Sequence, residues 1–160
     1  MIRRVEARDV KSITGIYNDY VEHGVASFEN QPLTEEEMLV RITGIAAKYP
    51  YVVFEEDHTV VGFAYAHQWK ERAAYHNTWE TTVYVAPAYL RRGIGELLMN
   101  RIISDCRKAG CHALIACITG GNLPSCRLHE KLGFRQVSFF KAVGEKLGRQ
   151  LDVVDYELLL

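Results

Sequence analysis

The sequence predicts a mixed α/β domain in which helices pack on a largely antiparallel β-sheet. Apolar residues recur at helical spacing in two segments near the start of the chain and in a long segment past its middle. Other short runs are rich in Val, Thr, Tyr and Ile, which favour strands. Two of these runs are joined by four polar residues, as is typical of an antiparallel hairpin.

Two amphipathic helices are expected after a short strand over Ile2–Ala7. Asp9 is placed to cap the first helix, which runs to about position 22 and stops at Gly24. In the second, Thr34 and Glu37 have the spacing of a capping box, in which each side chain accepts a hydrogen bond from the other residue's backbone. The apolar faces consist of Val10, Ile13, Ile16, Tyr17, Tyr20 and Val21 in the first helix, and Met38, Leu39, Ile42 and Ile45 in the second.

The middle of the chain changes to strand-like patterns. Tyr51–Glu55 and Val60–Ala66 form the expected hairpin, and Asn77–Val85 is a further strand. A long amphipathic helix then opens at Gly93 and closes at Gly110. Its apolar positions are Leu97, Leu98, Ile102, Ile103 and Cys106.

The last third adds three strands and one helix. Ala113–Ile118 is wholly apolar, as expected of a strand covered on both faces. A helix over Pro124–Leu132 is stopped by Gly133, and the strands Phe134–Val143 and Asp152–Leu159 complete a sheet of about seven strands. The predicted order is therefore βααβββαβαββ.

Composition excludes several classes of protein. The 160 residues are 48% hydrophobic and 24% charged, which is typical of one globular domain spanning 1–160. The 19 basic residues nearly balance 20 acidic ones, so no net charge favours nucleic acid or an anionic membrane. No apolar run approaches the roughly 20 residues that span a bilayer. Glu6 and Asp9 interrupt any signal-peptide core, so we expect a cytoplasmic protein.

The cysteines and histidines show no metal-ligand spacing, and we predict no metal site. No Cys-x-x-Cys pair occurs, and in a reducing compartment we expect free, mostly buried thiols. The cysteines are Cys106, Cys111, Cys117 and Cys126, and the histidines are His23, His58, His67, His76, His112 and His129.

The most informative local feature is a strand followed by two arginines and two glycines that open a helix. Gly93 and Gly95 let a ligand approach the backbone closely, and the first turn of a helix offers free N–H groups to phosphate or pyrophosphate. Arg91 and Arg92 add positive charge. Taken alone, the segment is equally consistent with a helix start beside two solvated arginines. It is neither a Rossmann fingerprint nor a P-loop, because position 98 is leucine and no Gly-Lys-Ser/Thr follows.

Two segments resemble the GNAT N-acetyltransferase superfamily. Leu90–Gly95 resembles its acyl-CoA loop, Gln/Arg-x-x-Gly-x-Gly/Ala, with Leu90 in place of the polar first residue. Asn122–Phe134 resembles a second family segment, Asn-x-x-Ala/Ser-x-x-x-Tyr-x-x-x-Gly-Phe. The resemblance covers essentially the whole chain. It implies the GNAT fold, in which the central strands splay apart, and acetyl-CoA as co-substrate.

Longer motifs resemble the phosphinothricin acetyltransferase branch of that superfamily. These motifs are Ile16–Asn18, Ser27–Glu29, Trp69–Tyr75, Glu80–Val85, Leu128–Glu130 and Gly144–Lys146. Enzymes of the branch acetylate the α-amino group of phosphinothricin, and often of methionine sulfoximine or sulfone, and are commonly homodimers. The resemblance therefore implies an amino-acid-like acceptor and a homodimer.

The resemblance also implies which residues bind acetyl-CoA. One group meets the pyrophosphate at the glycine turn, and the other meets the pantetheine arm and the thioester. The residues are Val83, Tyr84, Val85, Arg91, Arg92, Gly93, Ile94, Gly95, Glu96, Asn122 and Ser125. Taken alone, Asn122 before Pro124 also fits a helix cap, and the three strand residues fit ordinary pairing.

Catalysis is assigned by the resemblance to Glu80 and His129. A carboxylate does not deprotonate an ammonium efficiently by itself, so we expect Glu80 to act through ordered water or as an electrostatic partner. His129 stands where the superfamily commonly has a tyrosine acid and the branch has histidine, which can donate or shuttle a proton to the CoA thiolate. Taken alone, the two fit a solvated strand carboxylate and a helix-surface histidine. Tyr84, Tyr89 and Cys126 are further candidates for the acid.

The acceptor pocket is expected around Arg72, whose planar cation can hold a carboxylate or phosphinate in two hydrogen bonds. Tyr75 adds a hydroxyl and a wall, and Lys70 and Phe28 are second choices. Taken alone, the two cations fit loop charges and the two aromatics fit core residues. Trp79 replaces a small aliphatic residue of the branch, and we expect it to narrow the pocket.

Alternative functions follow from the same residues. An acidic pocket would favour a polyamine acceptor, and other antibiotics or a protein N-terminus would keep the same chemistry. A non-catalytic acetyl-CoA sensor would need neither Glu80 nor His129, so their presence favours an enzyme.

Overall fold

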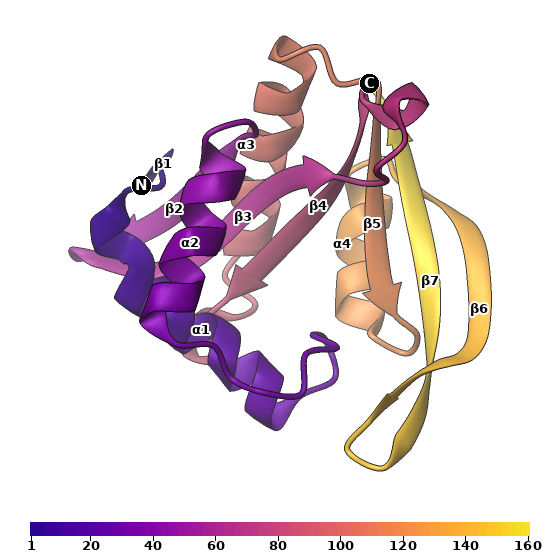
Figure 1. Ribbon diagram of the computed structural model, residues 1–160, viewed down its shortest axis with the longest axis horizontal. Helices are drawn as coiled ribbons and strands as arrows, with labels where there is room; N and C mark the ends of the chain where they lie inside the picture. Colours follow the sequence, from indigo (N-terminus) through magenta and orange to yellow (C-terminus); the bar gives the residue numbers. More distant parts are fainter.

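The computed structural model describes residues 1–160 and confirms the expected mixed architecture (Figure 1). Its elements are β1 (Ile2–Arg4), α1 (Val10–His23), α2 (Glu35–Ala46), β2 (Tyr51–Glu56), β3 (Thr59–Gln68), β4 (Thr78–Val85), α3 (Ile94–Lys108), β5 (Ala113–Thr119), α4 (Leu123–Lys131), β6 (Arg135–Lys146) and β7 (Arg149–Leu159). None of the helices has the length and apolar character needed to cross a membrane.

The seven strands form one sheet in the order β1-β2-β3-β4-β5-β7-β6. All neighbours are antiparallel except β4 and β5, which run parallel. This pair has only three positions in register, Thr78 with Ala113, Trp79 with Leu114 and Glu80 with Ile115. Beyond them the two strands diverge, as Figure 1 shows in its centre. The expected splay is therefore present.

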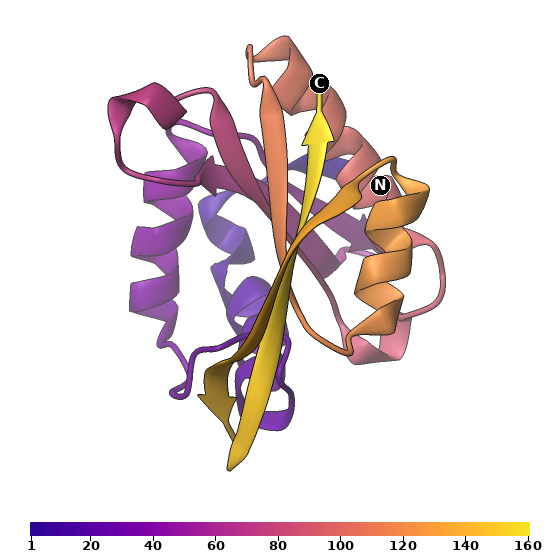
Figure 2. The same ribbon diagram turned by 90° about the vertical axis from the view of Figure 1, so that its right-hand side faces the viewer.

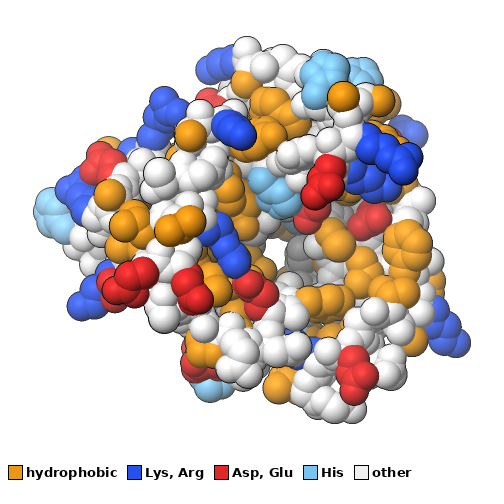
Figure 3. All heavy atoms as spheres, in the orientation of Figure 1, with side chains coloured by type: hydrophobic (Ala, Val, Ile, Leu, Met, Phe, Trp, Pro, Cys, Tyr) orange, Lys and Arg blue, Asp and Glu red, His pale blue; other side chains and the backbone are white.

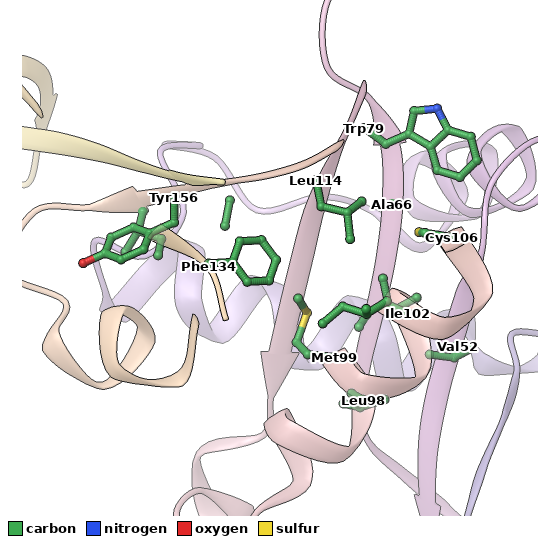
Figure 4. Packing of buried hydrophobic residues seen from close by; sticks show 14 of the residues in the cluster. Val52, Ala66, Trp79, Leu98, Met99, Ile102, Cys106, Leu114, Phe134 and Tyr156 are labelled. Atoms are coloured by element: carbon green, nitrogen blue, oxygen red, sulfur yellow. The ribbon is translucent and has the colours of Figure 1, made fainter. Parts of the chain in front are cut away.

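Helices cover both faces of the sheet and divide the core in two. Helices α1 and α2 lie on one side, and α3 and α4 lie on the other (Figure 2). The larger cluster packs α3 residues such as Leu98 and Ile102 against the sheet and reaches Phe134 (Figure 4). The smaller cluster packs Ile13 of α1 against residues that include Phe63 of β3. Because both faces of the sheet are buried, the register of each strand determines on which face, and in which of the two clusters, a side chain lies.

The capping signals of the two first helices have different outcomes. The capping box of α2 is confirmed: the Glu37 N–H donates to Thr34 Oγ1 at 3.1 Å, and the Thr34 N–H donates to Glu37 Oε2 at 2.8 Å. Asp9 precedes α1, but its side chain makes no cap. It accepts instead from the Arg3 guanidinium at 2.8 Å and from the Glu6 N–H at 2.8 Å. Asp9 therefore stands at the N-cap position of α1 as expected, but its carboxylate binds an arginine on β1 and the turn before the helix instead of the N–H groups of α1.

Gly120 fixes the turn that leads from β5 to α4. Its N–H donates to the Asp152 carbonyl at 2.7 Å. A Cβ atom at this position would lie 2.7 Å from Asp152 Cβ and 3.3 Å from the Asp152 carbonyl carbon and oxygen. Since that contact involves backbone, a side chain here forces β7 away from β5.

We predict that Gly120→Ala lowers the free energy of unfolding by about 1–3 kcal/mol, the usual cost of overpacking. Urea denaturation followed by circular dichroism measures the change. Gly15→Ala is the control, because Gly15 lies exposed in α1 with nothing within 4 Å of its added Cβ. Alanine there favours the helix, so this variant should be as stable as the wild type or more so. Equal stability of Gly120→Ala and the wild type would contradict the close contact.

Candidate active site

A cavity of about 490 Å³ opens where β4 and β5 separate. Its walls come from β3, β4, β5, α4 and the loop between α1 and α2, with one residue each from α1 and β7. Figure 3 shows a hollow near the centre of the face seen in Figure 1. The expected site residues that line the cavity are Phe28, Glu80, Val83, Tyr84, Asn122, Ser125 and His129.

The other expected residues do not line this cavity. Val85 ends β4, and the segment 91–96 leads from it into α3. Lys70, Arg72 and Tyr75 lie in the connection between β3 and β4. There Lys70 Nζ lies 4.3 Å from the centroid of the Trp69 ring and 5.6 Å from that of Tyr75. Of the four residues expected to bind the acceptor, only Phe28 therefore lines the cavity.

Trp79 corrects an expectation about the pocket. Its ring is buried in the larger core cluster, with its centroid 5.1 Å from that of Tyr49. Its Nε1–H donates to the His76 carbonyl at 2.8 Å. Successive residues of a strand point to opposite faces, so Trp79 turns away from the face that Glu80 occupies. The expectation that Trp79 narrows the pocket is therefore wrong.

Glu80 lies at the apex of the cavity, because it is the last residue of β4 that pairs with β5. Burial raises the pKa of its carboxyl, the nearby negative charge of Asp155 raises it further, and His67 opposes both. A raised pKa makes this carboxylate a stronger base than an exposed one.

His129 lines the cavity from α4 and is 3% exposed. Its Nδ1 lies 2.8 Å from the Ser125 carbonyl. A carbonyl only accepts, so Nδ1 carries the hydrogen and Nε2 keeps a lone pair in the neutral ring. Burial lowers the pKa of this imidazole, which favours the neutral form. In that form His129 takes up a proton at Nε2 before it can donate one.

Beyond Glu80, the backbone groups of β4 pair with a neighbouring strand only on the β3 side. The Ala86 N–H donates to the Val61 carbonyl on the β3 side at 2.8 Å. Alternation along a strand then turns the backbone groups of Val83 and Val85 toward the open side. The Tyr20 hydroxyl donates to the Val85 carbonyl at 2.6 Å. The backbone of Val83 remains directed at the gap between the strands.

The glycine turn presents a run of free donors. No backbone hydrogen bond uses the N–H groups of residues 91–96. Arg91 and Gly93 adopt left-handed conformations, with φ of 63° and 79°. Consecutive N–H groups in such a turn form a concave anion site at the N-terminus of α3. Two side chains expected there are engaged elsewhere: Arg92 pairs with Glu56 at 2.7 Å, and Glu96 pairs with Lys131 at 2.7 Å.

Asn122 acts as a helix cap, the simpler of its two interpretations. Its Oδ1 accepts from the Ser125 N–H at 3.4 Å at the start of α4. This bond uses only the side-chain oxygen, so the amide nitrogen is left to face the cavity that Asn122 lines.

The loop between α1 and α2 is held over the cavity from the far end of the chain. Lys146, which is 3% exposed, donates from Nζ to the Ser27 carbonyl at 2.6 Å. Thr119 Oγ1 donates to the Val25 carbonyl at 2.7 Å. The Phe28 ring lies against Gly144, where an added Cβ would overlap with the ring. A hydrogen bond from a charged donor contributes roughly 1.5–3 kcal/mol, so Lys146 is a principal anchor of this loop.

Sequence reasoning missed two residues of the site. His67 lines the cavity beside Glu80, and the strand expected there ended one residue too early to include it. Its alternation with Tyr65 along the strand is the signal that would have placed it on the cavity face. Lys146 was noted only within a motif, and no local pattern reveals its partner in a distant loop.

One of the four cysteines, Cys117, lines the cavity. The four cysteines are free, with Cys106 and Cys111 buried, Cys126 half-buried and Cys117 exposed. Nowhere in the structure do three or more His, Cys, Asp or Glu side chains come together in a way that could hold a metal ion.

Comparisons with known proteins point to one family. Residues 13–134 match the family described as the Acetyltransferase (GNAT) family. A phosphinothricin N-acetyltransferase of Alcaligenes faecalis is 39% identical over 155 residues, which are 96% of this chain and 79% of the relative. An L-methionine sulfoximine/L-methionine sulfone acetyltransferase of Salmonella typhimurium is 34% identical over 164 residues, 99% and 94% of the two chains. The crystal structure of a GNAT superfamily phosphinothricin acetyltransferase from Sinorhizobium meliloti, in complex with acetyl-CoA, has a TM-score of 0.97 and 38% identity, covering 100% of this chain and 88% of that one.

Burial of His129 predicts a specific dependence of stability on pH. Its pKa is lower in the folded state than the ordinary value of about 6.5, so the unfolded chain binds more protons as the pH falls through that value. The wild type should therefore lose unfolding free energy between pH 7.5 and pH 5. His129→Gln retains a donor for the Ser125 carbonyl but does not titrate, so we expect a shallower loss in urea denaturation over this range. His112→Gln, at an exposed histidine, should follow the wild type. Parallel curves for wild type and His129→Gln would contradict this prediction.

Proposed function

This chain belongs to the GNAT acetyltransferase family and is an acetyl-CoA-dependent N-acetyltransferase of its phosphinothricin and methionine sulfoximine branch, and from this we propose that it acetylates the α-amino group of phosphinothricin or a related amino-acid analogue. The observation that carries the proposal is the position of Glu80 at the apex of the gap between β4 and β5. A carboxylate there faces an incoming ammonium at the place where the thioester must lie.

Acetyl-CoA binding is supported by two sets of free backbone groups. The unpaired N–H groups of residues 91–96 suit the pyrophosphate. The open edge of β4 at Val83 suits the amides of the pantetheine arm and the thioester, and Asn122 and Ser125 face the same gap. Because Arg92 and Glu96 are paired with other side chains, the phosphate site relies on the backbone more than on those charges.

The transfer is direct and needs two proton movements. The acceptor ammonium loses one proton through water to Glu80, and its nitrogen then attacks the thioester carbonyl. The C–N bond forms, the C–S bond breaks, and the nitrogen loses its second proton. We assign this second proton to the free Nε2 of His129, which passes it to the departing sulfur. The neutral state of His129 fits such a shuttle better than a permanent acid.

The acceptor's acidic group is assigned to the connection between β3 and β4. Arg72 is the candidate for a bidentate bond to a carboxylate or phosphinate, with Tyr75 and Lys70 beside it. Phe28 lines the cavity from the loop between α1 and α2. This assignment distinguishes amino-acid analogues, which carry an anion, from polyamines, which do not.

A homodimer is supported by the outer edge of the sheet. Strand β6 is the last strand and has no partner on its free side. Apolar side chains exposed on it are Val137, Phe139, Phe140 and Val143. An unpaired apolar edge strand favours association with another strand or sheet. We assign this surface to a second copy of the chain.

The principal test is thiol release from acetyl-CoA with phosphinothricin or methionine sulfoximine as acceptor. Glu80→Gln should lower kcat/KM by about 100-fold or more, the usual contribution of a general base. Acetyl-CoA affinity, measured by calorimetry, should stay unchanged. Glu145→Gln on β6 is a matched control and should retain activity, because Glu145 is exposed.

The remaining outcomes of this assay identify the alternatives. Release with a polyamine alone would retain the fold and the co-substrate but overturn the role of Arg72. Acetyl-CoA binding with no release by any acceptor would favour a sensor. Full activity of Glu80→Gln would overturn the assignment of the base.

The proposed dimer has its own test. In light scattering, the wild type should have twice the mass of one chain, and Phe139→Asp should have the mass of one chain. A charge on the apolar edge opposes its burial in a dimer. Val40→Asp alters an exposed apolar residue on α2 and should leave the mass unchanged. A wild type that is monomeric at high concentration would contradict the dimer.

A further inference from the structure

His67 and Glu80 form an opposed pair on neighbouring strands. Residue 67 of β3 is in register with residue 80 of β4, and directly opposed residues of an antiparallel pair place their side chains on the same face. His67 Nε2 lies 3.9 Å from Glu80 Oε1. Both side chains line the cavity, and they are 33% and 28% exposed. The pair is thus reachable from the acceptor and from solvent.

The proton positions on His67 are fixed by the backbone. Its Nδ1 lies 2.8 Å from the Gln68 carbonyl, which can only accept, so Nδ1 carries the hydrogen. The neutral ring therefore keeps its lone pair on Nε2, the atom that faces Glu80. The ring is oriented to accept a proton from the direction of the carboxylate.

We propose that His67 is a proton-relay residue that acts through Glu80: it receives the proton which Glu80 takes from the acceptor ammonium and releases this proton to solvent. The role rests on the proposed function. The ammonium N–H bond breaks, and its proton passes through water to the Glu80 carboxylate. Because 3.9 Å is too long for a direct hydrogen bond, the carboxylic acid then transfers this proton through one water to His67 Nε2, which forms an imidazolium and restores the Glu80 anion. The imidazolium loses the proton to water, so each turnover releases one proton while the second follows the sulfur.

The relay is useful because the acceptor ammonium and the Glu80 carboxylic acid differ in acidity. An amine ammonium holds its proton above neutral pH, whereas a carboxylic acid releases its own well below it. An imidazole nitrogen is a stronger base than a carboxylate, so it can take the proton from the Glu80 acid and restore the anion before the next acceptor binds. His67 therefore removes the proton that Glu80 takes from the ammonium.

Other groups act on the pair from each neighbouring element. On β3 itself, the Tyr65 ring lies 5.8 Å from the His67 ring. From β7, the negative charge of Asp155 acts on Glu80. From β5, the Cys117 thiol lines the same cavity, and its pKa is raised by burial and by the charges of Asp155 and Glu80. Beyond Tyr65, Arg41 and Glu29 carry opposite charges that act on that tyrosine. Glu80 is thus the charged group that faces Nε2 directly.

The test compares His67→Gln with the wild type in thiol release across pH 6 to 10, with methionine sulfoximine as acceptor. We expect kcat to fall about tenfold or more at pH 7 and KM for acetyl-CoA to stay unchanged. The deficit should shrink toward pH 10, where the acceptor amine is deprotonated without help. His112→Gln, at an exposed histidine outside the cavity, is the matched control.

A second variant separates a chemical role from a structural one. Added imidazole should raise kcat of His67→Ala toward the wild-type value and leave wild type and His112→Gln unaffected. A pH profile of His67→Gln parallel to that of the wild type, or no rescue by imidazole, would overturn the relay. Absence of release by the wild type itself would overturn the proposed function and, with it, the role of His67, so the two failures are distinguishable.

Discussion

The short parallel contact between β4 and β5 is the constraint on which the site depends. Buried backbone groups need hydrogen-bond partners, and a sheet normally supplies them. On the β5 side of β4, pairing with a neighbouring strand ends at Glu80. Beyond this point the Tyr20 hydroxyl is the one protein group that replaces a strand partner, by donating to the Val85 carbonyl. The remaining groups face a gap that a polar, extended ligand arm can fill. The same divergence leaves space for the proposed acceptor, so the proposed binding site and the proposed reaction site both depend on it.

Backbone carbonyls decide the chemistry of the two imidazoles at this gap. Gln68 fixes the ring of His67 from a strand, and Ser125 fixes the ring of His129 from a helix. Each ring consequently carries its hydrogen on Nδ1 and offers a lone pair at Nε2. The roles proposed for the two imidazoles therefore depend on local backbone geometry as well as on residue type.

The order of helices and strands could be predicted because both periodicities are strong, but faces and partners could not. Met38 and Leu98 are buried whereas their neighbours Leu39 and Leu97 are exposed, since residues adjacent on a helix lie about 100° apart and cannot both face the sheet. Glu80 and His129 were found through a resemblance. His67 escaped notice because its importance comes from cross-strand register, which depends on the hairpin as a whole.

The anchoring of the loop between α1 and α2 by Lys146 has a consequence for biosynthesis. The two bonded residues, Ser27 and Lys146, are separated by 119 positions. Long-range contacts of this kind form late, after the intervening chain has closed. A nascent chain that has emerged through α3 already contains the glycine turn, but it lacks the anchor for its loop. The glycine turn can thus take shape on the ribosome, whereas the cavity wall that contains Phe28 must await the final hairpin.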